Sequence, residues 1–271
     1  MMSTMMKNNS INSDYEAKKL LNFSIKFSYS LLYNGAEVYR VEDSINRICK
    51  SFQNVKAVNT FSLINMVIIS FVYNGTNYTI MRRLNDSGKN LEKIALLNEL
   101  SRNIVSGKVD VDEAFKELKN IKNKSSYSNF TTILLITLSA PFLAFIFGGT
   151  LSDFIPASMA MLVEMLFLIY IGKLGLPSFL TTFLSACAVT LFIMTMSRLI
   201  HIENVSSIII AGIIPLFPGI QITNSMRDIL SGDILSGIIG IMSAIFTAVS
   251  IAVGVVLILR LFGWVVLWIY F

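Results

Sequence analysis

The chain has 271 residues, of which 54% are hydrophobic and only 14% are charged, and its mean hydropathy is +0.66. This composition is too apolar for an ordinary soluble enzyme. Residues 1–124 hold 18 of the 22 basic and 12 of the 17 acidic side chains, so the rest of the chain is nearly free of charge. Basic and acidic residues are interspersed, which argues against nucleic acid as a partner. The chain therefore divides into a polar part and a membrane part.

The polar part is predicted to be a small domain in the cytosol. Residues 1–13 are rich in Met, Asn and Ser and are interpreted as a disordered tail. Residues 14–124 are predicted to form a cytosolic α+β domain, because no apolar secretory signal precedes them. Cys49 lies in the polar half and Cys187 inside an apolar run, and this pair offers neither a disulfide framework nor a metal-binding spacing.

Hydrophobic periodicity gives the order of elements in this domain as two helices, a β-hairpin and two helices. Asn34-Gly35 ends the first helix, and Asn74-Gly75 is a strong hairpin turn signal between two β-rich runs. Each helix has an apolar stripe for one shared core. The predicted helices lie at about 20–34, 36–52, 91–107 and 111–118, and the two strands at 57–73 and 76–84.

The chain from 125 to 271 is predicted to be a mainly helical transmembrane domain with about five spans. Lysines precede the first span, which places that end in the cytosol by the positive-inside rule. The fourth span is short and contains Pro215 and Pro218, a pattern typical of a discontinuous transporter helix. The predicted spans are 130–150, 154–171, 179–197, 205–220 and 234–261.

Two pairs of sequence motifs resemble the threonine/serine exporter family. The polar half contains Asn34–Ser44 and then Asn98–Arg102, and the membrane half contains Gly212–Gly219 and then Asn224–Asp228. The resemblance runs from about Leu20 to Leu261 and points to the family component with an N-terminal cytosolic domain and about five spans.

The resemblance implies an exporter of small polar metabolites in the plasma (inner) membrane. Threonine or serine would be the first substrate and a dicarboxylate such as succinate the second, with the proton motive force as driving energy and no cofactor. The chain looks like the split form of the family. Its partners would then be a small membrane subunit, a further copy of itself, the substrate, protons and the lipid bilayer.

A first group of candidate residues lies in the cytosolic motif. Glu37, Arg40 and Asp43 follow one another at steps of three residues, opposite the apolar stripe of their helix. They form either a solvated ladder of ion pairs, each worth a few tenths of a kcal/mol, or a surface that docks on the cytosolic mouth of the transporter. The cytosolic motif is Gly35, Glu37, Arg40, Glu42 and Asp43.

A second group lies beyond the interrupted span. If a helix restarts after Pro218-Gly219, then Gln221, Asn224 and Asp228 share one face, with Arg227 beside it. The amides could bind a substrate carboxylate or ammonium, Arg227 a carboxylate, and Asp228 an ammonium or a proton. The alternative is an ordinary loop in which Arg227 and Asp228 pair and Asp233 caps the next helix. The candidate substrate and proton path is Glu164, Pro215, Pro218, Gly219, Gln221, Asn224, Arg227 and Asp228.

Glu164 stands near the middle of the second span with no basic residue within one helical turn. It is either a proton-coupling site or a hydrogen-bonded contact between helices. Two other functions stay open. A membrane-anchored enzyme is disfavoured because His201, the single histidine, is predicted on the opposite face. A regulatory or scaffold subunit needs neither a buried carboxyl nor an interrupted span.

Overall fold

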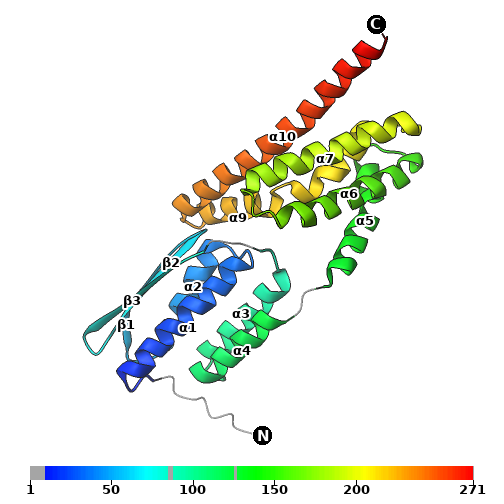
Figure 1. The fold of residues 1–271 in the computed structure, drawn as a ribbon. Helices are drawn as coiled ribbons and strands as arrows, with labels where there is room; N and C mark the ends of the chain where they lie inside the picture. The colour runs from blue at the N-terminus through cyan, green and yellow to red at the C-terminus, as the bar shows by residue number, and fades with distance from the viewer. Residues whose placement is uncertain (1–9, 85–87, 125–126, 271) are drawn as a thin grey trace. The chain divides into compact units, whose positions relative to one another are not determined.

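The computed structural model describes the backbone of residues 10–84, 88–124 and 127–270, and side chains as far as Gly263 (Figure 1). The described chain is mainly helical and contains one small antiparallel sheet. It divides into two compact units. The first unit comprises the chain up to Lys124 together with Ile220–Ile241, and the second comprises Ser125–Gly219 and the chain from Met242 onward.

The first unit contains helices and one sheet, and local sequence signals mark where its helices begin. Side chains just before several of its helices cap the first turn. For example, Ser13 accepts from the Glu16 amide, and Asn90 accepts from the Lys93 amide. The elements before Lys124 are α1 (Asp14–Tyr33), α2 (Val38–Lys50), β1 (Val55–Leu63), β2 (Met66–Tyr73), β3 (Thr76–Arg83), α3 (Leu91–Val105) and α4 (Val111–Asn123). The unit also includes α9 (Gly219–Leu230) from Ile220 onward and the first turns of α10 (Ile234–Tyr270).

The sheet has three strands in the order β1-β2-β3, so the prediction of a single hairpin was wrong. The run expected at 57–73 is two strands joined at Ile64 and Asn65, where Leu63 pairs with Met66. The carbonyl of Asn65 accepts a hydrogen bond from the Leu84 amide at 2.7 Å. The turn contains an apolar residue, so the hydrophobic pattern of the sequence did not indicate a break between two strands. The turn expected at Asn74-Gly75 is confirmed, with positive φ at both residues.

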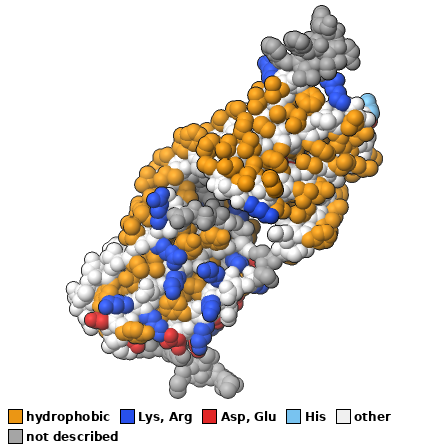
Figure 2. Space-filling model, in the orientation of Figure 1, with side chains coloured by type: hydrophobic (Ala, Val, Ile, Leu, Met, Phe, Trp, Pro, Cys, Tyr) orange, Lys and Arg blue, Asp and Glu red, His pale blue; other side chains and the backbone are white. Residues whose placement is uncertain are grey.

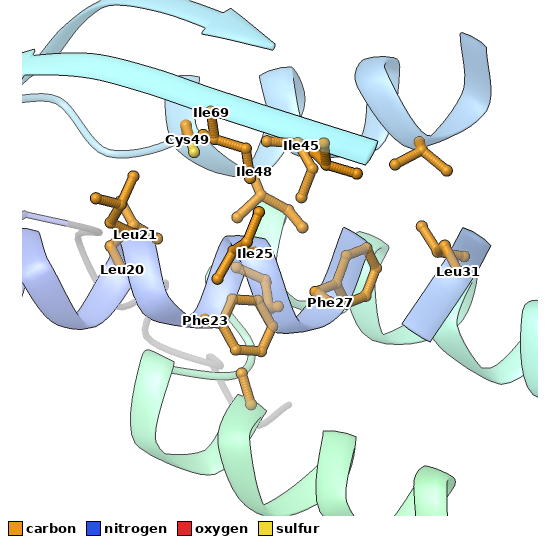
Figure 3. Close-up of a cluster of buried hydrophobic side chains, with 14 of the residues drawn as sticks. Leu20, Leu21, Phe23, Ile25, Phe27, Leu31, Ile45, Ile48, Cys49 and Ile69 are labelled. Atoms are coloured by element: carbon orange, nitrogen blue, oxygen red, sulfur yellow. The ribbon is translucent and has the colours of Figure 1, made fainter. Parts of the chain in front are cut away.

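The core of the first unit is organised around α1, as its apolar spacing predicts. Figure 3 shows Phe23 and Phe27 of α1 in the same cluster as Ile45 and Ile48 of α2 and Ile69 of β2. All five side chains are at most 1% exposed. Residues 1–9 of the expected tail lie outside the described residues. Ile11 is buried, and its carbonyl accepts hydrogen bonds from Asn54 and Tyr73.

The second unit consists of apolar helices. Figure 2 shows hydrophobic side chains over most of its visible surface, which suits contact with lipid. Its elements are α5 (Asn129–Ile146), η1 (Leu151–Asp153), α6 (Phe154–Gly172), α7 (Ser178–Leu199), α8 (Val205–Ile213), η2 (Ile214–Leu216) and the rest of α10.

Four helical segments are long and apolar enough to cross a membrane: Asn129–Ile146, Leu151–Gly172, Ser178–Leu199 and Ile234–Gly263. The expected fourth span is interrupted, as its prolines predicted. There Val205–Leu216 and Gly219–Leu230 pass the same test only together and are bent by 56° at the break. The pair is a broken span or a re-entrant loop, so the described chain has four candidate spans, or five if the pair is one span.

Small residues bring the helices of the second unit close together. Ala140, Ala144, Ala157 and Ala160 are fully buried. A Cβ atom at Gly212 would lie 3.0 Å from Val189 Cγ2. Alanine and glycine allow helix backbones to approach within a membrane, where apolar burial gives little drive for association.

Gly237→Ala should destabilise the first unit. A Cβ at this position would lie 2.3 Å from Ile229 Cγ1 and 2.7 Å from the Ser225 carbonyl oxygen, so α9 and α10 would have to separate. In a solvent-exposed helix with no close neighbour, replacing glycine by alanine stabilises the helix by about 1 kcal/mol. We expect a lower thermal unfolding midpoint for the full chain in detergent. The matched control is Gly263→Ala, whose Cβ would meet nothing within 4 Å, and a midpoint unchanged in both variants would contradict the close packing.

Candidate functional site

The first candidate site lies in the first unit, where α9 meets the start of α2. Glu37, the residue before α2, makes no side-chain cap, so the first amides of that helix need another acceptor. Asp228 of α9 supplies it: its Oδ1 accepts from the Tyr39 amide at 3.3 Å, and the residue is only 3% exposed. A carboxylate at a helix N-terminus also favours the helix dipole. We call this contact the α2–α9 junction.

Two further side chains of α9 complete the junction. Asn224 Nδ2 donates to the Gly35 carbonyl at 3.0 Å, and Gly35 has a φ of +88°, which the turn before α2 requires. The guanidinium of Arg227 pairs with Glu37, which is 8% exposed. Arg40 approaches the other oxygen of Glu37 at 3.4 Å. The nearly buried carboxylate therefore lies between two cations.

The structure thus brings the two separated motifs together. The alternative in which Arg227 and Asp228 pair with each other is wrong, because each binds a different group near the start of α2. Gln221 Nε2 donates to the Gly240 carbonyl of α10 at 3.3 Å. The expected ladder on α2 is present in part: Asp43 is exposed and pairs with Arg47 at 2.9 Å.

Glu42 is the partly buried acid of the same region. Its Oε1 accepts from the Ser62 amide of β1 at 2.6 Å, and Ser236 of α10 donates to the Ser62 carbonyl at 3.1 Å. Burial raises the pKa of Glu42 to about 7, opposed by the Ser62 amide and reinforced by the negative charges of Asp233 and Asp228. Glu42 can therefore gain or lose a proton near neutral pH.

The raised pKa of Glu42 predicts a pH-dependent stability. The folded chain holds this proton more tightly than the unfolded chain, whose glutamate has a pKa near 4.5, so stability is lost as pH rises from about 4.5 to 7. Glu42→Gln keeps an oxygen acceptor for Ser62 and removes the charge. We expect it to stabilise the protein by about 1 kcal/mol at pH 8, with a smaller gain at pH 5. Thermal unfolding at both pH values tests this, and an equal gain at each would contradict it.

The second candidate site is in the second unit, around Glu164 of α6. The residue is fully buried, and neither carboxyl oxygen has a hydrogen-bond partner among the described residues. Three other buried hydroxyl groups share this property within the described chain: Ser62 Oγ in the first unit, and Thr137 Oγ1 of α5 and Ser185 Oγ of α7 in the second. Buried polar groups in apolar surroundings are normally satisfied, so three orphan groups on adjacent helices mark a site.

Helix geometry places these three groups at one level. Gly212 of α8 lies against both Ala160 of α6 and Val189 of α7, so those two residues are level with each other. Successive helices joined by short connections run in opposite directions. One turn further along, α6 therefore presents Glu164 where α7 presents Ser185. Ala140 of α5 belongs to the same cluster as Ala160, and one turn further in the same direction lies Thr137.

The break after α8 lies at this level too. One turn beyond Gly212 is Leu216, which packs with Ala186, the neighbour of Ser185. Pro215 has no amide to donate to the Ala211 carbonyl one turn earlier, so that carbonyl loses its helical partner. Phe217 and Pro218 separate η2 from α9, which begins at Gly219. A carboxyl, two hydroxyls and the proline-interrupted turn thus lie on neighbouring elements of the second unit at a similar level.

Comparison with known proteins agrees with the motifs. The family described as "Putative threonine/serine exporter" matches residues 22–262. The chain belongs to the threonine/serine exporter family. A "Probable threonine/serine exporter" of Mycobacterium tuberculosis is 23% identical over 250 residues, which cover 91% of this chain and 47% of that protein. The chain therefore spans about half the length of this curated relative, and no solved structure matches it.

The site residues predicted from the sequence did not include several residues of both sites. Ser62, Ser225 and Ser236 connect elements through backbone groups or close packing, which leaves no pattern in a sequence. Thr137 and Ser185 did carry a signal, because each is a hydroxyl within an apolar span. Among the described residues, no group of three or more His, Cys, Asp or Glu side chains could hold a metal ion.

Proposed function

We propose that this member of the threonine/serine exporter family exports a small hydroxylated amino acid, threonine or serine, and exchanges it for protons at Glu164. The observation that supports this most strongly is the layer of unpartnered polar groups around Glu164 in the second unit. An unpaired buried group is costly unless it binds something during the protein's cycle. A helix that served only as an anchor would gain nothing from it.

The chemistry of this layer suits an amino acid. An ionised Glu164 would attract the substrate ammonium, while the hydroxyls of Thr137 and Ser185 would exchange hydrogen bonds with the substrate hydroxyl or carboxylate. Protonation of Glu164 would remove that attraction and release the substrate. One carboxyl would thus bind either a proton or the substrate, which couples the two flows.

The same chemistry ranks the substrates. Succinate carries two carboxylates and no cation, so an ionised Glu164 would repel it. The described helices of the second unit place no Lys or Arg in this layer to compensate. Threonine and serine therefore rank first, and a dicarboxylate would need cationic groups from elsewhere.

For the residues of the α2–α9 junction we propose a positioning role. Gln221, Asn224 and Asp228 each already bind a group of the first unit, so their polar atoms hold α9 in place. α9 is the second half of the bent helix pair, and its position is set by these contacts. The part of the first unit up to Lys124, which precedes the spans, would then be cytosolic and would act on transport through α9, in a chain resident in the plasma membrane.

The function is tested by efflux from proteoliposomes containing the purified chain and loaded with radiolabelled threonine, serine or succinate. We expect efflux of threonine and serine to be at least fivefold faster than from protein-free vesicles loaded in the same way, when the proton gradient is directed into the vesicles. Succinate should remain inside. A second arm adds the part of the relative that this chain does not cover, which tests whether transport requires it. Succinate efflux alone would overturn the substrate, and no efflux in either arm would favour a scaffold function.

A further inference from the structure

A cleft in the first unit has no part in the sites described above. It lies between α1, β3, α3 and α4 and has a volume of about 910 Å³, which is in the range of small-molecule binding sites. Six cationic side chains line it, and none of the described residues around it is Asp or Glu. They are Lys26, Arg82, Lys93, Lys116, Lys119 and Lys122.

The charges of the cleft are not compensated within the described chain. Elsewhere in this unit cations pair with acids, as Lys19 does with Asp112 and Lys124 with Glu92. None of the six cleft cations has an ion pair among the described residues. Lys93 donates to the Lys122 carbonyl at 2.9 Å, at the C-terminal end of α4 where a cation is favoured, so five positive charges remain for a ligand.

The cleft also contains aromatic and apolar surface. The Arg82 guanidinium lies 4.0 Å from the centre of the Tyr29 ring, and the Lys26 ammonium lies 5.2 Å from that of Phe115. A guanidinium stacked on a ring keeps its in-plane N–H groups free for an anion. Leu97 and Leu118 add buried apolar surface. Figure 2 shows Lys and Arg side chains on the visible face of the first unit around exposed hydrophobic side chains.

We propose that this cleft binds a nucleoside polyphosphate, with its phosphates at the lysines of α4 and Arg82 and its base against the aromatic and apolar side chains. Like charges confined to a concave surface focus their field and favour a ligand with several negative charges. The aromatic and apolar surface would be unused by inorganic phosphate. A membrane surface is flat and would contact only the rim of a concave site, whereas a nucleotide is of a size to enter it.

Binding is tested with the full chain in detergent, using ATP, tripolyphosphate and inorganic phosphate as probes in calorimetric titrations at physiological salt. We expect ATP to bind at least fivefold more tightly than tripolyphosphate, because only ATP carries a base. The double variant Arg82→Gln/Lys119→Gln should weaken ATP binding at least tenfold. The matched control, Lys50→Gln/Lys56→Gln, removes the same charge from exposed positions of α2 and β1 and should leave it unchanged.

Lysine footprinting of the protein without substitutions gives an independent test if the double variant does not fold. ATP should protect Lys26, Lys116 and Lys119 from an amine-reactive reagent and leave Lys50 and Lys56 reactive. Equal weakening in both double variants, equal affinity for ATP and tripolyphosphate, or no protection would overturn the proposal. Binding to phosphatidylglycerol vesicles that the cleft variant weakens, without ATP binding, would assign the cleft to lipid instead.

Discussion

Glu164→Gln should reduce proton-coupled export at least tenfold while the protein remains folded and inserted. Glutamine has nearly the same shape as glutamate and fits the same buried position, but it cannot ionise to attract an ammonium or carry a proton. The original carboxyl has no partner among the described residues, so the substitution breaks no known hydrogen bond. Stability should be unchanged or higher, because a buried ionisable group without a partner is costly.

The measurement is threonine efflux from proteoliposomes at a series of imposed pH gradients, with thermal unfolding of the same preparations. Glu203→Gln is the matched control, because Glu203 is an exposed glutamate in the same unit. This variant should leave the dependence of export on the pH gradient intact. If Glu164→Gln retains both the rate and its dependence on the gradient, Glu164 is only a packing residue. Ser185→Ala should act in the same direction more weakly, because it removes one hydroxyl from the layer and no charge.

Asp228→Ala should destabilise the first unit by about 2 kcal/mol, the upper range for loss of a helix cap. The buried carboxylate accepts from the Tyr39 amide, and no side-chain cap of α2 replaces it. Asp228→Asn should cost roughly half as much, since the amide oxygen can still accept that hydrogen bond but loses the charge that favours the helix dipole. Chemical or thermal unfolding of the full chain measures both.

The pair of Asp228 variants also separates positioning from transport. If Asp228 acts as a cap, export by each variant should follow its folded fraction, and Asp228→Asn should export at near the normal rate. If Asp228 binds substrate or a proton, Asp228→Asn should abolish export without loss of stability. Asp43→Ala is the control on α2, because its exposed pair with Arg47 is worth only a few tenths of a kcal/mol.

Much of the fold follows from local sequence. Apolar residues at helical spacing, such as Phe23 and Phe27, place α1 in the core, and Asn74-Gly75 fixes the β2–β3 turn. Long apolar runs predict the spans, and Pro215 and Pro218 predict the interruption after α8, since proline cannot continue the helical hydrogen bonds. The β1–β2 turn escaped prediction because Ile64 keeps the run apolar through the reversal.

The sequence by itself determined the family, through motifs in a fixed order, and it singled out Glu164 because charge is rare in an apolar span. Only the tertiary structure decided what those residues touch. The partners of Asn224, Arg227 and Asp228 stand about 190 positions earlier in the chain, and no local pattern encodes a contact at that separation. The level shared by Glu164, Thr137 and Ser185 likewise depends on how antiparallel helices align, which packing at small residues such as Gly212 sets.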